Sequence, residues 1–214
     1  MEQLFYLIGV ATYAAQALIA LWGGFNVVLA WRRVAQVQFR READQDRFLD
    51  ELEDKLQSGE FEEAAALSES NRKAMPQLAL YAIENRDMDY NKLQRRLTER
   101  LQNDVLADLE HRLSWVGTVI KTAPMLGLFG TVIGMMGAFA NLGSGTKVDP
   151  GQLAQDIFFA LITTAIGLAT AMPLLVCLAA INVRIRKMED LVAAGLTRLI
   201  EAVKLVSEPA EVRR

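Results

Sequence analysis

The sequence has very few of the residues that form covalent cross-links or bind metals. Its 214 residues include one cysteine, Cys177, and one histidine, His111. A single cysteine cannot form an intrachain disulfide, and His111 has no second histidine and no nearby cysteine to complete a metal site. We therefore expect no metal ion and no cofactor. Cys177 is interpreted as a small packing residue, and His111 as part of a solvated helix surface.

An excess of basic charge is also absent. Lysine and arginine number 23 against 26 aspartates and glutamates, which gives a formal net charge of −3. Nucleic-acid-binding domains carry a basic patch, so this balance argues against nucleic acid as a partner. The sequence shows no nucleophile–base pair and no phosphate-binding loop, and we predict that the protein is not an enzyme.

Charge of either sign is missing from three long stretches, residues 3–31, 122–146 and 157–183. A helix needs about 20 apolar residues to cross a hydrocarbon core of about 30 Å, and each stretch is long enough. The first is too long for a cleaved signal peptide and lacks a basic segment ahead of it. We find no strand pattern. The sequence thus predicts an all-α fold: an integral membrane helical bundle with three transmembrane helices and long cytoplasmic helical extensions.

Basic residues predict the orientation of the three helices, because lysine and arginine gather on the cytoplasmic side of a membrane. They follow the first stretch, precede the second and follow the third: Arg32, Arg33, Arg40, Arg41, Arg112, Lys121, Arg184, Arg186 and Lys187. The N-terminus and the 142–156 loop are therefore expected outside, and residues 32–120 and the C-terminal tail inside.

The predicted organisation has five segments. These are an N-terminal segment with transmembrane helix 1 (1–31), a cytoplasmic helical domain (32–120), transmembrane helix 2 with the start of an external loop (121–146), that loop with transmembrane helix 3 (147–183), and a cytoplasmic C-terminal helix and tail (184–214). Within the cytoplasmic domain, Ser58 and Gly59 are expected to end a charged helix that follows residue 32, a short acidic helix to come next, and Pro76 to lie near a first helical turn.

Two further helices are expected to extend the second and third spans. A leucine-rich pattern of period four predicts an unbroken helix into the second span: Leu93, Leu97, Leu101, Val105 and Leu109. The third span is expected to continue past residue 186 along an alternation of four and three: Val192, Leu196, Leu199, Val203 and Val206. This C-terminal seam could pack against the chain's own cytoplasmic helices or against another copy.

Small residues mark one face of each of the last two spans. In the second span the face holds Gly127, Thr131, Gly134 and Ala138, with Gly130 and Gly137 beside it. The third span repeats the spacing with Ala160, Thr164, Gly167 and Ala171, flanked by Thr163 and Thr170. Small side chains allow close approach of helices in lipid. The two faces are expected either to meet each other or to surround something.

The amino-acid sequences of these two spans resemble those of a known protein family. "TAPMLGLFGTVIGMMGAF" (122–139), a short loop and "ALITTAIGLATAMP" (160–173) are similar to the ExbB/TolQ/MotA family of proton-channel subunits. Three spans resemble the ExbB and TolQ branches. The resemblance implies a homopentamer with a pore lined by the second and third spans. It also implies a single-span partner of the ExbD/TolR kind, which supplies the proton-carrying aspartate.

On this resemblance Thr131 and Thr164 are pore-facing threonines that assist a proton relay, with Thr163 beside them. Gly127, Gly130, Gly134, Gly137 and Gly167 are helix-packing residues that let the copies pack tightly. One position departs from the family pattern: the ExbB and TolQ branches usually carry a glutamate where this chain has Phe159. Asp156, one turn earlier, could replace it at the external mouth or could simply be an acidic residue of a first helical turn.

The resemblance therefore implies a subunit of a motor driven by the proton-motive force in the bacterial inner membrane. It would transmit energy to envelope partners, among them a TonB- or TolA-like transducer. The alternative is a non-conducting structural scaffold of the same fold, favoured by Phe159.

Overall fold

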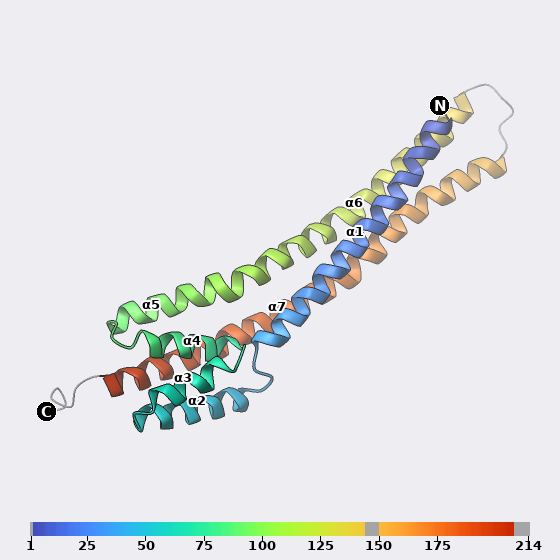
Figure 1. Cartoon of the computed structure of the whole chain (residues 1–214). Coiled ribbons are helices and arrows are strands. Elements are labelled where there is room, and N and C mark those ends of the chain that lie inside the picture. Colours follow the sequence, from blue (N-terminus) through green and yellow to red (C-terminus); the bar gives the residue numbers. More distant parts are fainter. Residues whose placement is uncertain (1, 144–149, 208–214) are drawn as a thin grey trace. The chain divides into compact units, whose positions relative to one another are not determined.

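The computed structural model describes residues 2–143 and 150–207, and every regular element in the described part is a helix, without a strand. Its elements are α1 (Glu2–Val37), α2 (Glu42–Gln57), α3 (Phe61–Glu69), α4 (Ala74–Glu84), α5 (Tyr90–Arg100), the π-helical segment η1 (Leu101–Leu106), α6 (Ala107–Gly143) and α7 (Pro150–Ser207) (Figure 1). The centre of the predicted external loop, 144–149, lies outside the described residues.

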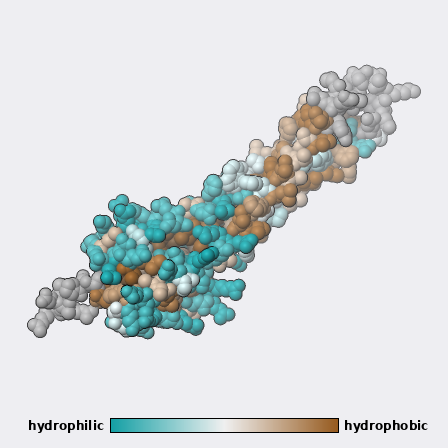
Figure 2. Space-filling model, viewed as in Figure 1, coloured by the Kyte–Doolittle hydropathy of each residue, from teal (hydrophilic) through white to brown (hydrophobic). Residues whose placement is uncertain are grey.

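Three of these helices, α1, α6 and α7, are long and apolar enough to cross a membrane. Figure 2 shows mostly hydrophobic surface over the parts of these helices within residues 1–29 and 112–180, and individual large side chains are strongly exposed, such as Leu21 (72%), Met125 (68%) and Val176 (68%). Such a surface is unfavourable in water and is expected of helices surrounded by lipid or by neighbouring membrane helices. The prediction of an all-α membrane chain with three transmembrane helices is confirmed.

The chain divides into two compact units. Unit 1 comprises residues 1–29 and 112–180, and unit 2 comprises residues 30–111 and 181–214. The long helices α1, α6 and α7 contribute to both, whereas α2, α3, α4, α5 and η1 belong to unit 2 alone.

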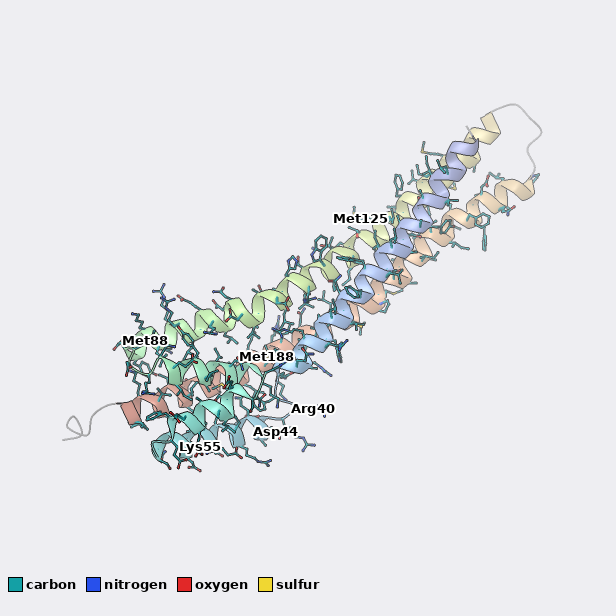
Figure 3. All side chains as sticks on the ribbon, viewed as in Figure 1. Arg40, Asp44, Lys55, Met88, Met125 and Met188 are labelled. Atoms are coloured by element: carbon teal, nitrogen blue, oxygen red, sulfur yellow. The ribbon has the colours of Figure 1, made fainter. Side chains whose placement is uncertain are left out.

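Unit 2 is built around an apolar core of long aliphatic side chains. Helix α2 presents an apolar face at spacings of three and four residues, which is the helical period. Its contributions are joined by others from α4, α5 and α7, and the fully buried set includes Leu49, Leu52, Leu56, Met75, Leu78, Leu93, Leu97, Met188, Leu199 and Ile200. Met188 lies on α7 (Figure 3).

The C-terminal part of α7 contributes its seam to this core. Val192, Leu196, Leu199 and Val203 are all buried within unit 2. A Cβ added at Gly195 would lie 2.9 Å from Gln45 Nε2 and 3.2 Å from Leu49 Cδ1. Of the two roles open for the seam, packing within the chain is therefore the one observed.

Charged side chains fix α2 to its neighbours. Arg198 on α7 lies 2.9 Å from Asp50, 3.0 Å from Glu53 and 3.7 Å from Asp46. The hydrogen bonds that it donates to Asp50 and Glu53 raise the pKa of the Arg198 guanidinium.

A second ion pair joins α2 to α3. Lys55 on α2 (Figure 3) pairs with Glu63 on α3, and its hydrogen bond lowers the pKa of the Glu63 carboxyl.

The helix boundaries agree with the turn residues in the sequence. Helix α2 ends at Gln57, and Gly59 adopts φ +78°, a left-handed conformation that suits glycine. Pro76 is the third residue of α4, where its missing N–H costs no helical hydrogen bond. The charged stretch that follows residue 32 is interrupted, because α1 ends at Val37 and α2 begins at Glu42.

The expectation of a regular helix running into the second span was wrong in one place. The π-helical turn η1 separates α5 from α6, and Leu106, not Val105, is buried. A π turn adds one residue to the helical repeat. The buried series therefore steps by five residues, from Leu101 to Leu106, before it continues at Leu109 and Leu113.

Candidate functional site

The small-residue faces of α6 and α7 meet each other within unit 1. Buried residues of α6 lie at Ala123, Gly127, Gly130 and Ala138, and those of α7 at Ala160, Thr163, Gly167 and Ala171. Both series follow the three- and four-residue spacing of one helix face. The contact is therefore a continuous small-residue seam between two helices of one chain.

Glycine is required at four points of this seam. An added Cβ would lie 2.7 Å from the Thr163 carbonyl oxygen at Gly127, and 2.5 Å from Thr163 Oγ1 at Gly130. It would lie 2.8 Å from Ala160 Cβ at Gly134, and 2.5 Å from the Ala123 carbonyl oxygen at Gly167. These separations are far below van der Waals contact. Two of the obstacles are backbone atoms, which no side-chain rotation can move.

The seam differs from the predicted faces by one residue. The sequence placed Thr131 and Thr164 on the two faces, whereas the structure buries Gly130 and Thr163 and leaves Thr131 and Thr164 partly exposed at the margin. Gly127, Gly130, Gly134 and Gly167 bring α6 onto α7 of the same chain. Their expected role in packing copies against one another stays a prediction. Gly137, the fifth predicted packing residue, is partly exposed.

Thr163 is the polar centre of the seam. Its side chain is 4% exposed, and its hydroxyl lies 3.0 Å from the Gly127 carbonyl oxygen on α6 and 2.6 Å from the Ala160 carbonyl oxygen in its own helix. It can donate its single hydrogen to either carbonyl. The close approach at Gly127 thus lets a threonine of α7 reach the backbone of α6.

Thr131 and Thr164 present their hydroxyls differently. Thr131 donates to the Leu128 carbonyl oxygen in its own helix at 2.7 Å, which leaves its oxygen free to accept a hydrogen bond. The Thr164 hydroxyl oxygen is buried and has no hydrogen-bond partner in the described structure. Among the described threonines of unit 1, Thr164 alone does not donate its hydroxyl hydrogen to a backbone carbonyl three or four residues earlier. The threonines that do so are Thr12, Thr118, Thr122, Thr131, Thr163 and Thr170.

Helix α1 supplies polar contacts to the same region that sequence analysis missed. Gln16 is 4% exposed and donates from Nε2 to the Thr163 carbonyl oxygen at 2.7 Å. One turn away, the Tyr13 hydroxyl donates to the Phe159 carbonyl oxygen at 3.0 Å. The signal available was the placement of Thr12 and Gln16 one turn apart within an otherwise apolar stretch. Such residues in a membrane helix face a protein interior, because lipid offers no partner.

The remaining predicted residues lie toward the start of α7. Asp156 is partly exposed, and Phe159 is exposed by 48%. Phe159 thus presents an aromatic ring where the resemblance expects a carboxylate. No group of three or more histidines, cysteines or acidic residues that could hold a metal ion is found in the part of the chain that the structure describes.

Comparison with known sequences assigns the chain to a family. Residues 63–194 match the sequence profile of the MotA/TolQ/ExbB proton channel family. The match covers more than half of the chain and contains both faces of the α6–α7 seam. The chain belongs to the MotA/TolQ/ExbB proton channel family. The relatives named ExbB and TolQ, together with the three spans, support the ExbB/TolQ-like branch of the family.

Individual relatives match over shorter regions. A putative biopolymer transport protein ExbB homolog from Methanothermobacter thermautotrophicus is 44% identical over 33% of this chain and 24% of its own length. The Tol-Pal system protein TolQ of Haemophilus influenzae is 37% identical over 41% of this chain and 39% of its own. A putative biopolymer transport protein ExbB-like 2 of Helicobacter pylori is 39% identical over 39% of this chain and 54% of its own. The matched regions thus span between a quarter and about half of these relatives.

The match to the MotA/TolQ/ExbB family begins after α1. Gln16 and Tyr13 therefore lie outside the matched residues, whereas Thr131, Thr163 and Thr164 lie inside.

Proposed function

We propose that the protein is an ExbB/TolQ-like subunit of a motor driven by the proton-motive force. Five copies would form a pore lined by α6 and α7, around a single-span ExbD/TolR-like partner that carries the titratable aspartate. The assembly would lie in the bacterial inner membrane, with the N-terminus outside and unit 2 in the cytoplasm. It would pass energy to a TonB- or TolA-like transducer. Family membership carries this proposal, since the match covers both proposed pore helices.

The family match supports a lining role for Thr131 and Thr164, and both residues lie partly exposed at the margin of the α6–α7 seam. The Thr131 oxygen can accept a hydrogen bond, whereas the Thr164 hydroxyl oxygen is buried within the single chain, so a lining role for Thr164 requires its side chain to turn outward in the assembly. Thr163 is enclosed by the seam and serves as a packing and hydrogen-bonding residue. A hydroxyl lining assists proton movement without the cost of an ionised group in the membrane. The threonine side chains would act on protons or water carried by the partner's carboxylate.

The proposed pore lining contains few side chains that can gain or lose a proton. Phe159 occupies the usual glutamate position, and Asp156 is the nearest acid, one turn earlier. The partner's aspartate would therefore carry the titrating chemistry. A membrane potential supplies about 2.3 kcal/mol per proton per 100 mV, and several protons per cycle could drive a conformational change in the partner.

Proton flux tests the proposal. The chain, co-expressed with an ExbD/TolR-like partner and reconstituted in vesicles, should acidify the lumen when a potential is imposed. Thr131→Val and Thr164→Val remove a hydroxyl at nearly constant volume and should each reduce the flux by at least tenfold. Thr170→Val is the matched control, because it removes a hydroxyl of α7 that is assigned no role in the pore; that hydroxyl, like that of Thr131, donates to its own helix.

Phe159 favours a second function, a non-conducting scaffold of the same fold. Native mass spectrometry of the detergent-extracted complex separates the two. Five copies that retain the partner, with flux sensitive to both threonine variants, would support the motor. Five copies that never retain the partner and pass no protons would support the scaffold. Any other copy number would contradict the proposed assembly.

A further inference from the structure

The three long helices of unit 1 meet at a level marked by Gly23, Val119 and Leu174. A Cβ added at Gly23 would lie 2.8 Å from Val119 Cγ1 on α6 and 2.8 Å from Leu174 Cδ1 on α7. Lys121 follows Val119 by two residues, so its Cα lies about 3 Å further along α6. Depth along the three helices can therefore be counted in residues from this level, at about 1.5 Å per residue.

The outward faces of the three helices differ near this level. The exposed residues of α1 between 17 and 28, and those of α7 between 165 and 180, are all apolar, as suits contact with lipid or with other membrane helices. Helix α6 instead exposes Ser114, Thr118 and Lys121, which follow one another at helical spacing on one face. This polar stripe therefore has different surroundings from the apolar faces of α1 and α7.

The long helices of a neighbouring copy hold no carboxylate close enough to pair with Lys121. Along α6 the nearest acidic residue is Glu110, eleven residues earlier and about 16 Å away. On the other side, Asp156 precedes Leu174 on α7 by 18 residues, which places it more than about 20 Å from Lys121 along the helices. Copies related by an axis normal to the membrane hold each residue at the same depth, so a second copy brings these acids no closer.

Lipid headgroups are also too far from Lys121. The first charged residue after Gly23 on α1 is Arg32, nine residues later. The first after Leu174 on α7 is Arg184, ten residues later. These apolar lengths place the headgroups about 15 Å or more from Lys121, much further than a lysine side chain extends. A charged side chain at such a depth faces a water-filled cavity, because hydrocarbon does not solvate it.

We propose that Ser114, Thr118 and Lys121 face a water-filled vestibule of the pore, open to the cytoplasm, and that Lys121 attracts small anions into it. This inference rests on the proposed ring of copies, which encloses the vestibule. The stripe becomes apolar at Met125 of α6 (Figure 3), so the vestibule ends before Thr131. One lysine from each copy at the same depth gives this water a positive potential, which walls of low dielectric strengthen.

Charged thiol reagents test the water and the potential together. Cys177→Ser removes the chain's single cysteine, and Thr118→Cys then places a thiol one turn from Lys121. Negatively and positively charged methanethiosulfonates that cannot cross the membrane are added to inverted membrane vesicles, from the cytoplasmic side. The thiol should react, because water is needed to form the reactive thiolate. Lys121→Gln should lower the ratio of the anionic to the cationic rate by about threefold or more, and Lys121→Arg should keep it.

The matched controls are thiols at the same depth on the other two helices. Leu21→Cys on α1 and Val176→Cys on α7 replace strongly exposed apolar side chains near the level of Gly23. Both should react at least about tenfold more slowly than Thr118→Cys, because a thiol in an apolar environment stays protonated. Ser114→Cys, one turn earlier on the stripe, repeats the measurement at a second position. Native mass spectrometry shows whether each variant keeps the copy number of the unmodified chain.

Three outcomes would overturn the vestibule. If Thr118→Cys and Ser114→Cys react no faster than Leu21→Cys, the stripe is dry. If all of these thiols react rapidly, this level lies in bulk water outside the membrane. An unchanged ratio of rates in Lys121→Gln would mean that the lysine attracts no anions.

The vestibule and the proposed motor can fail separately, because thiol labelling needs no proton flux. Proton flux that depends on Thr131, together with a dry stripe, would remove the vestibule alone. A wet, anion-attracting stripe in an assembly that passes no protons would remove the motor alone.

Discussion

Unit 1 and unit 2 are both all-helical, yet different side chains hold them together. In unit 2 the helices pack through leucine, isoleucine and methionine, and ion pairs such as Arg198 with Asp50 connect them at the surface. In unit 1 the closest contacts are made by Gly127, Gly130 and Gly167, while large apolar side chains point outward.

The difference follows from the surroundings of each unit. In water, burying apolar area is the main driving force for folding, so large apolar side chains go inside. In lipid the same side chains gain little from burial, so helices associate through close backbone approach and hydrogen bonds. Glycine and threonine therefore hold the helices of unit 1 together, as leucine holds those of unit 2 together. The two units should respond differently to the same kinds of substitution.

The largest effect is expected in the core of unit 2. Leu52 is fully buried on α2, and Leu52→Ala should destabilise unit 2 by about 2–5 kcal/mol through lost burial and a residual cavity. Hydrogen exchange followed by mass spectrometry should show faster exchange across α2, α4 and α5. Leu205→Ala, at a position 58% exposed, is the control and should change little. Equal effects of the two variants would contradict the assigned core.

A smaller effect is expected when a methyl group is added to the seam of unit 1. Gly167→Ala would place Cβ 2.5 Å from the Ala123 carbonyl oxygen, and the overpacking should cost about 1–3 kcal/mol. Gly24→Ala is the matched control, because an added Cβ there meets nothing within 4 Å. The free energy of unfolding of both variants can be compared by adding a denaturing detergent stepwise to the protein in mixed micelles. If Gly24→Ala proved as damaging as Gly167→Ala, the close approach of α6 and α7 would not be what stabilises unit 1.

The smallest effect concerns the ion pairs of unit 2. Arg198→Met removes three carboxylate contacts, but the Arg198 side chain is 40% exposed, so solvent screens them and the loss should be about 1 kcal/mol or less. The loss should shrink at high salt, because salt screens exposed charges. Hydrogen exchange of α2 at low and high salt measures how this loss of stability depends on salt. A loss independent of salt would contradict the attribution of this effect to the ion pairs of Arg198.

Much of the difference between unit 1 and unit 2 could be predicted from the amino-acid sequence. Uninterrupted apolar stretches predicted the three spans, because a charged residue in lipid is costly. Turn chemistry predicted the end of α2 at Ser58 and Gly59, since a positive φ suits glycine. The small-residue spacing predicted that α6 and α7 each carry a packing face. It placed Thr131 and Thr164 on these faces, whereas the structure buries the preceding residues Gly130 and Thr163, because successive residues on a helix differ by only about a third of a turn.

Two features depended on tertiary structure and were not predictable from the pattern. The π turn at η1 depends on whether Val105 or Leu106 is buried, and both are apolar. The role of Gln16 depends on which backbone group lies opposite it, and nothing in α1 specifies the Thr163 carbonyl. Such features arise where helices from distant parts of the chain meet.

The α6–α7 seam also limits which amino-acid substitutions this chain can accept in evolution. At Gly127 and Gly167 the obstacles to an added Cβ are backbone atoms, so compensation by a second substitution on the facing helix is not available. At Gly130 the obstacles are the Oγ1 of Thr163 at 2.5 Å and its Cβ at 2.8 Å. Among substitutions at 163 only glycine removes both atoms, and it would also remove the hydroxyl that reaches the Gly127 carbonyl. One contact surface thus combines positions at which no facing substitution can compensate with one position, Gly130, at which compensation costs the threonine hydrogen bond.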